Sequence, residues 1–309
     1  MAAPKMLLIL SENWTMTHGR DMASLIRWAR EAEEAGFDSV MISEHVVLGP
    51  DAGADGIMGN PRDYAEPGNQ DPYTSWPSSI VLLSAIAAVT SRLRLVAGAI
   101  LAPLRHPLLI ANELATLDLV SEGRLVVLPT VSWSRDEYAA LGVPFGKRGK
   151  LLDEHLAVWD KVWRESPADF DGEFYPFKDV YMEPKPYRPG GPQLWFGGST
   201  LHPALIRRIV RYGHGFNPLG RPKPGELELL AQAMKDAGRD ISELEMVGGT
   251  RVVFPDNDSV ASLDQALAVI PEQMEQGFGT FCVKPSQFTD DPDDVAGFCR
   301  RVMARVSTL

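Results

Sequence analysis

Short apolar runs alternate with longer segments of helical periodicity along almost the whole chain. The run KMLLIL, residues 5–10, has the length and composition of a buried strand. Apolar side chains then recur at helical spacing from Met22 to Ala32, and Gly36 predicts the end of that helix. The same alternation predicts strands at residues 5–10, 38–43, 92–99, 123–129, 193–198, 214–218, 243–254 and 278–285. It predicts helices between them, including residues 22–35, 78–90, 107–120, 150–164 and 291–306.

Eight successive strand and helix units predict an α/β fold of the (β/α)8 TIM barrel type. The length of 309 residues suits one such barrel with insertions, so we interpret residues 1–309 as a single domain. Residues 46–76 are rich in Gly, Pro, Asp and Asn, which predicts a long functional loop and makes a closing lid plausible. Residues 166–192 are dense in Pro and aromatics, and DFDGEFYPF within them predicts a small β-hairpin insertion.

The charge balance points to a small-molecule partner. A formal net charge of −11 and a pI near 5.1 argue against surfaces that neutralise nucleic acid or anionic lipid. No secretory h-region or membrane-spanning run is visible, so we expect a cytoplasmic protein. Cys282 and Cys299 lack CxxC spacing and the histidines form no HxH or HExxH pattern, so no disulfide and no catalytic metal are predicted.

Polar residues follow most of the predicted strands, and in a barrel of this type the carboxyl ends of the strands build the active site. The rim includes Glu12 after the first strand, Glu44 and His45 after the second, and Lys284 after the last. His45 is the first candidate for chemistry, since histidine readily gives and takes a proton near neutral pH. A purely structural role for His45 is the alternative, and Glu44 could likewise only cap the loop. Glu12 and Glu44 also fit the carboxylate pair of a glycoside hydrolase in the same fold.

Two further stretches suggest ligand contacts. FGGST, residues 196–200, precedes a helix, and its glycines would expose backbone amides that can hold a phosphate. A simple glycine turn is the alternative. Trp133 would wall a flat ring, with Ser132 beside it, or would plug the barrel mouth.

Several longer segments of the chain together resemble a known protein family. GFDSVMISEHV, RLRLVAGAILAPLRHPLLIANELATLDLVSEGRLVV, DGEFYPFKDVYMEPKP, QLWFGGS and YGHGFNP resemble the bacterial luciferase-like monooxygenase family. The similarity covers nearly the whole chain and is strongest to the branch that depends on the deazaflavin coenzyme F420, whereas other branches use FMN. It implies the same barrel, a homodimer, and a deazaflavin or flavin across the barrel mouth.

The resemblance also implies roles for individual residues. The strand-two pattern places catalytic His45 and Glu44 near the reactive ring, with Ser43 beside them. A bulge after strand three, with a non-proline cis peptide at Ala99-Ile100, would support the ring. The phosphate turn would be Gly197, Gly198 and Ser199. The remaining cofactor contacts expected are Ser132, Trp133 and Asn217. Where the family has GVGxGW after strand four, this chain reads LPTVSW, so Pro129 and Thr130 could narrow the cofactor slot.

Three functions follow as hypotheses. The first is an F420-dependent oxidoreductase that moves a hydride between the deazaflavin C5 and an activated alkene, carbonyl or alcohol, with His45 handling the proton and Glu44 orienting it. The second is an FMNH2-dependent monooxygenase that uses O2 and a partner reductase. The third is a non-catalytic flavin-binding protein.

Overall fold

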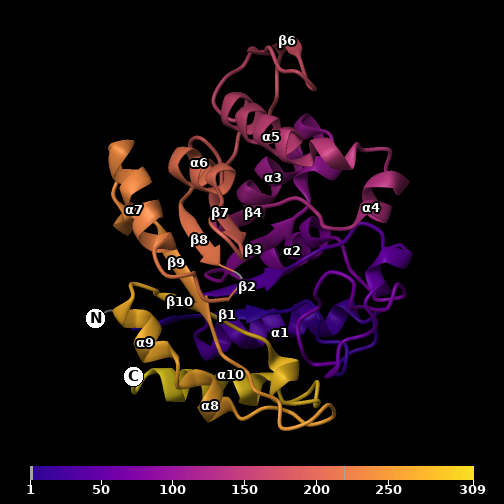
Figure 1. The fold of residues 1–309 in the computed structure, drawn as a ribbon, viewed down its shortest axis with the longest axis vertical. Coiled ribbons are helices and arrows are strands. Elements are labelled where there is room, and N and C mark those ends of the chain that lie inside the picture. The colour runs from indigo at the N-terminus through magenta and orange to yellow at the C-terminus, as the bar shows by residue number, and fades with distance from the viewer. Residues whose placement is uncertain (1–2, 219) are drawn as a thin grey trace.

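The computed structural model describes residues 3–218 and 220–309 and contains a closed barrel of eight parallel strands (Figure 1). Going around the barrel, the strand order is β1-β10-β9-β8-β7-β4-β3-β2. The predicted (β/α)8 fold is therefore confirmed. The barrel strands are β1 (Lys5–Ile9), β2 (Ser39–Ile42), β3 (Arg94–Ile100), β4 (Leu125–Pro129), β7 (Gln193–Gly198), β8 (Gly215–Pro218), β9 (Glu245–Gly249) and β10 (Thr280–Val283).

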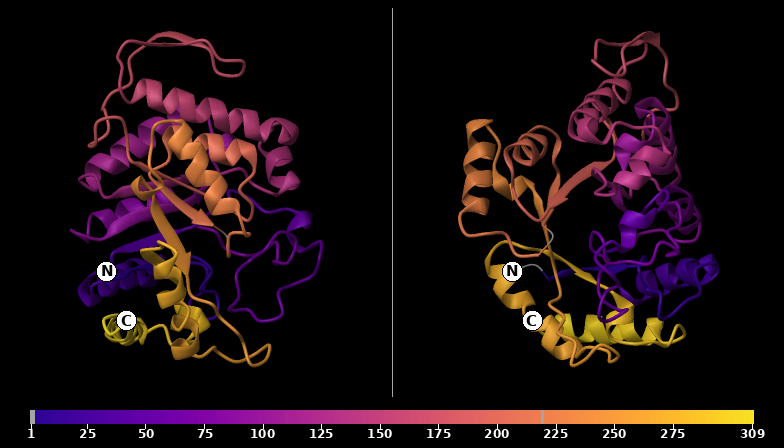
Figure 2. Two further views of the ribbon diagram at one scale, coloured as in Figure 1. Left: turned by 60° about the vertical axis from the view of Figure 1, so that its left-hand side comes forward. Right: turned by 45° about the vertical axis from the view of Figure 1, so that its right-hand side comes forward.

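Helices surround the barrel on its outside (Figure 2). They are α1 (Met22–Ala35), α2 (Ser79–Ala87), α3 (Pro107–Val120), α4 (Arg135–Ala140), α5 (Arg148–Val162), α6 (Pro203–Tyr212), α7 (Glu226–Asp236), α8 (Leu263–Leu267), α9 (Ile270–Glu275) and α10 (Val295–Val306). Short 3-10 turns lie at Pro50–Gly53, Ala102–Leu104, Phe145–Lys147, Ile241–Glu243 and Pro285–Gln287. Within the described residues, none of these helices combines the length and the apolar composition that a membrane span requires.

Local signals explain where most elements begin and end. Asp21 caps α1 by accepting a hydrogen bond from the amide of Ser24, and Gly36 ends the helix at a φ of 96° that an L side chain rarely adopts. The predicted hairpin is confirmed as β5 (Ala168–Phe170) paired antiparallel with β6 (Phe177–Val180). It projects beyond α5, away from the barrel (Figures 1 and 2).

One prediction about an element was wrong, and one element went unpredicted. The predicted strand 243–254 ends at Gly249, because Thr250 still bonds β10 but Arg251 donates its amide to Ala266 outside the barrel. The apolar residues after Arg251 therefore belong to a loop. The short helix α4 went unpredicted, because its six residues are too few to show helical periodicity.

An ion-pair cluster lies at the amino end of the barrel interior, and apolar side chains fill the rest of the interior. Arg94 at the start of β3 pairs with Asp38 and Glu245 at 2.5 and 2.6 Å, and its guanidinium lies 5.4 Å from the ring of Trp195. The interior side chains above this layer include Leu7, Ile9, Met41, Val96, Val126, Leu128, Val247 and Cys282. The packed interior leaves the carboxyl ends of the strands as the place for a ligand.

Candidate active site

The carboxyl ends of the barrel strands lie together, and the long loop 46–76 is fastened over them. The amide of Ala65 in this loop donates to a carboxylate oxygen of Glu12 at 2.8 Å. Lys284, which follows β10, donates through Nζ to the carbonyl oxygen of Asp63 at 2.6 Å. The loop is thus held by residues that end the first and the last barrel strand. The Lys284 ammonium, a polar group of the predicted rim, is therefore engaged with the loop backbone.

His45 follows β2 at this end of the barrel and contacts two indoles. Its ring meets those of Trp76 and Trp133 edge to face, with centroids 5.1 and 5.4 Å away. Its Nδ1 atom is 3.3 Å from Oε2 of Glu137, and 10% of the side chain is exposed. Trp133 therefore lies beside the histidine, and Trp76 contacts it from the end of the long loop.

Glu137 on α4 is the carboxylate that holds this histidine. Its side chain is fully buried and accepts hydrogen bonds from Oγ of Ser132 at 2.5 Å and from the amide of Val46 at 2.7 Å. Burial alone would raise the pKa of Glu137, but the hydrogen bonds from His45, Ser132 and Val46 outweigh it and lower the pKa. The carboxylate is therefore ionised. Because an ionised carboxylate can only accept, Nδ1 of His45 donates its proton to Glu137, and Nε2 is the ring nitrogen left free of this contact.

The sequence analysis missed Glu137, although the chain carries a local signal there. Ser134 and Glu137 have the spacing of a capping box, in which a serine and a glutamate three residues later close a helix start. The Ser134 hydroxyl does accept the amide of Glu137 at 3.1 Å. The glutamate side chain, however, turns to His45, which is 92 residues away in the sequence.

Glu44 does not orient His45, so the predicted pairing of these neighbours is corrected. Both oxygens of Glu44 contact the guanidinium of Arg105, at 2.7 and 3.1 Å. They also accept from the Ser79 hydroxyl and the Leu101 amide at 2.8 and 3.0 Å. Adjacent residues at a strand end face opposite sides, which separates the two side chains. A glutamate so fully engaged also suits a glycosidase acid or base poorly.

Ser43 and the β3 bulge lie at the same end of the barrel. The amide of Ser43 donates to the Ser11 hydroxyl at 3.1 Å. The β3–β4 register shifts between Gly98 and Ile100, so the predicted bulge is confirmed. The cis peptide joins Gly98 to Ala99, one bond before the predicted Ala99-Ile100 position, which was therefore wrong. A Cβ at Gly98 would lie 2.9 Å from the sulfur of Met41, so glycine allows the Met41 side chain of β2 to pack closely here.

The glycine turn after β7 is only partly as expected. Helix α6 follows the predicted turn as expected, but it begins at Pro203 and is capped by His202, so Gly197, Gly198 and Ser199 precede its first turn. A Cβ at Gly197 would lie 2.5 Å from the carbonyl oxygen of Asn217, so this glycine serves the close pairing of β7 with β8. Within the residues that the structure describes, the amides of Ser199 and Thr200 have no hydrogen-bond acceptor.

Comparison with known proteins gives consistent results. A sequence model described as luciferase-like monooxygenase matches residues 6–294. The uncharacterized protein Rv0953c of Mycobacterium tuberculosis is 36% identical over 217 residues, which are 69% of this chain and 74% of that protein.

Two solved structures share the fold at low sequence identity. An F420-dependent secondary alcohol dehydrogenase in complex with an F420-acetone adduct has a TM-score of 0.74 at 15% identity and covers 99% of both chains. The oxygenating constituent of 3,6-diketocamphane monooxygenase from Pseudomonas putida, in complex with FMN, has a TM-score of 0.71 at 17% identity, again over 99% of both.

Proposed function

Because this chain belongs to the luciferase-like monooxygenase family and is an enzyme of that family, we propose that it is an F420-dependent oxidoreductase. Its substrate would be a small organic molecule such as an activated alkene, a carbonyl compound or an alcohol. The observation that carries the proposal is the His45–Glu137 pair, placed between two indoles at the carboxyl end of the barrel. The likeness to a dehydrogenase with an F420-acetone adduct supports the same assignment.

The residues at the barrel mouth fit a deazaflavin or flavin. Met41, Leu128 and Cys282 form an apolar floor, and half-buried Ala99 of the bulge packs on it. Ala99, Ile100, Ser132 and Trp133 would face or support the ring. An apolar surface with a few polar groups is typical of cofactor sites. The amides after Gly198, with Asn217 on the neighbouring strand β8, would hold the polar tail, and Ser43 after β2 would be a further cofactor contact.

The protein's own residues would position the substrate and handle the proton. Bound F420 would supply or accept the hydride at C5 of its ring. Nε2 of His45 would accept the proton of an alcohol, or donate one to the oxygen of a carbonyl compound. Glu137 would hold the imidazole in that orientation, and the loop 46–76 with Trp76 would keep water from the reacting groups.

A second candidate keeps the site and changes the cofactor. The likeness to a monooxygenase structure with bound FMN supports an FMNH2-dependent monooxygenase served by a separate reductase. Oxygen uptake coupled to substrate conversion distinguishes the two, because a deazaflavin does not activate oxygen. Cofactor binding without turnover under any donor would instead indicate a non-catalytic flavin-binding protein.

Parallel titration of the protein with F420 and FMN tests the cofactor assignment. We expect F420 to quench tryptophan fluorescence saturably and FMN to leave it unchanged, because Trp76 and Trp133 flank His45. The Trp133→Phe variant should lose a large part of the quenching. A preference for FMN would favour the FMNH2-dependent monooxygenase instead. Binding of neither cofactor would mean that Pro129 and Thr130 close the cofactor slot.

We also propose that the protein forms a homodimer through the outer face of α2 and α3. These helices pack against each other and expose Val81, Leu109 and Val120 to 70%, 66% and 50%. Apolar side chains exposed together are typical of an interface. Light scattering should give twice the chain mass for the wild type and the single mass for Leu109→Asp. Leu229→Asp, at an equally exposed leucine on α7, should remain dimeric, and a monomeric wild type would contradict the proposal.

A further inference from the structure

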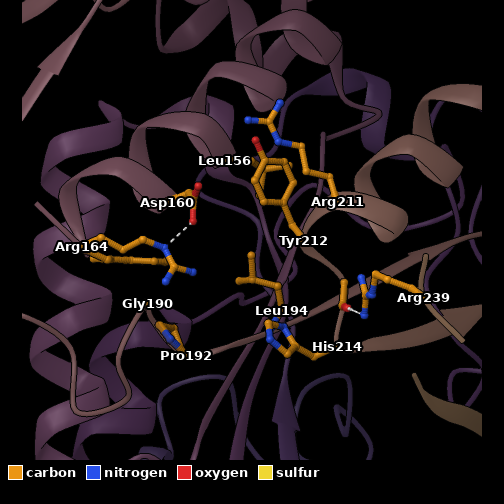
Figure 3. Close-up of a pocket in the computed structure, with 12 residues that line it drawn as sticks. Leu156, Asp160, Arg164, Gly190, Pro192, Leu194, Arg211, Tyr212, His214 and Arg239 are labelled. Atoms are coloured by element: carbon orange, nitrogen blue, oxygen red, sulfur yellow. Dashed lines mark hydrogen bonds and ion pairs between the residues drawn. The ribbon is translucent and has the colours of Figure 1, made fainter. Parts of the chain in front are cut away.

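A cavity of about 260 Å³ opens at the amino end of the barrel (Figure 3). Its lining includes Pro192 and Leu194, where β7 begins, and Gly213 and His214, which lead into β8. Because the strands are parallel, this places the cavity at the opposite end of the barrel from His45. Its ligand would therefore be independent of the cofactor and substrate proposed above.

Three arginines from separate segments of the chain line this cavity. Figure 3 shows Arg164, which follows α5, Arg211 of α6, and Arg239, which follows α7. Arg239 is fixed there, because it donates to the carbonyl oxygens at the end of α6 and pairs with Glu243. A protein of net charge −11 thus gathers cationic groups on one concave surface.

Little negative charge offsets these groups inside the cavity. Among the described residues that line the cavity, Asp160 is the one carboxylate. It accepts a hydrogen bond from Nε of Arg164 at 2.8 Å, and the two terminal nitrogens of Arg164 do not contact it. Among the residues that the structure describes, Arg211 has no carboxylate partner, and its guanidinium lies 4.9 Å from the ring of Tyr212. Two guanidinium groups therefore have donors available for an oxyanion.

His214 adds a neutral donor to the same cavity. Its Nδ1 accepts the amide of Leu194 at 3.2 Å, so the proton of the neutral ring lies on Nε2. Desolvation of the ring, followed by the nearby Arg239, lowers the pKa of His214 and keeps it neutral. Leu194, Trp163 and Pro192 supply apolar surface next to these donors.

We propose that this cavity binds a small molecule that carries an oxyanion group, a carboxylate or a phosphate, on a compact apolar body. The anion would lie beside the terminal nitrogens of Arg164, with Nε2 of His214 as a further donor. The exposed side chain of Arg211, which lies against Tyr212 without a ligand, would turn toward the anion. The apolar body would contact Trp163 and Leu194. The cavity is slightly smaller than the ~300 Å³ at which ligand pockets usually begin, which restricts the body to about one ring.

Calorimetric titration with benzoate and with inorganic phosphate tests this proposal. Benzoate has the apolar body and phosphate does not, so a preference for either identifies which source of the oxyanion the cavity takes. The titrations are run at constant ionic strength, because exposed guanidinium groups attract any anion at low salt. We expect saturable binding of at least one probe by the wild-type protein. Absence of binding of both at about 10 mM, a concentration that detects even millimolar dissociation constants, would overturn the proposal.

Variants locate the bound anion. Arg211→Gln and Arg164→Gln should each weaken binding by about tenfold or more, as expected for loss of a charged hydrogen bond. Arg207→Gln is the matched control, because Arg207 is exposed on the same helix and does not line the cavity. All three positions are solvent-exposed, so their unfolding midpoints without ligand should match the wild type. Equal weakening by the Arg207 and Arg211 variants, or no weakening by either cavity variant, would place the anion elsewhere and refute the site.

Discussion

His45→Ala is expected to lower kcat by about 10²- to 10⁴-fold at saturating substrate, the usual contribution of a positioned acid or base. The physical reason is the single free nitrogen of this ring, because Nδ1 is committed to Glu137 and Nε2 alone can exchange a proton with substrate. Rates are measured as substrate-dependent change of the cofactor that the titration selects. Cofactor affinity, measured separately, should change far less than kcat. Unchanged turnover at saturating substrate would remove His45 from the chemistry.

Glu137→Gln tests whether the carboxylate acts through the histidine. A glutamine amide that donates to Nδ1 would shift the ring proton to Nε2, and the acceptor would be lost. We therefore expect kcat to fall by a similar order while KM stays near its original value. The Glu137→Asp variant, which keeps the charge, should recover part of the loss. Glu34→Gln, at an exposed glutamate on α1, is the control and should be neutral. A higher KM with an unchanged kcat would indicate a merely structural role.

Arg94→Met is expected to destabilise the fold by about 3–5 kcal/mol, the usual result of removing one partner of a buried ion pair. Arg94 is the only cation that the structure places against both Asp38 and Glu245, and 16% of its side chain is exposed. Its loss leaves two carboxylates close together at the amino end of the barrel. Urea unfolding gives the free energy change directly.

Two controls separate the buried ion pair from charge in general. Arg305→Ala removes a highly exposed partner of Asp264 and should cost less than about 1 kcal/mol. Adding Asp38→Asn and Glu245→Gln to Arg94→Met removes the uncompensated charges and should recover much of the loss. If Arg94→Met and Arg305→Ala cost the same, the amino-end cluster does not hold the barrel together.

The same cluster predicts how stability depends on pH. Burial would raise the pKa of Glu245, but its hydrogen bonds to Arg94 and Thr280 lower it below the ordinary value of 4.5. A carboxyl group with a depressed pKa stabilises the folded state above its unfolded pKa, and that contribution is lost as the pH falls through the folded value. The wild type should therefore lose stability below about pH 4.5 more steeply than the Glu245→Gln variant.

Sequence alone determined the barrel, most element positions, the hairpin insertion and the place of His45. These features depend on periodicity, glycine signals and strand ends, all of which are local along the chain. The end of the strand at Gly249 and the helix α4 were less accessible, because a chain can leave a sheet in mid-run and six residues show no period.

Only the tertiary structure decided which side chains meet. Sequence proximity suggested Glu44 as the partner of His45, yet the barrel turns Glu44 to Arg105 and brings Glu137 from 92 residues away. The tertiary structure also shows the cis peptide bond at Gly98–Ala99 and three arginines that line a cavity at the amino end of the barrel. Local pattern determines which face a residue lies on, whereas closure of the barrel determines what that face touches, because the contacts join strands and helices that are distant in sequence.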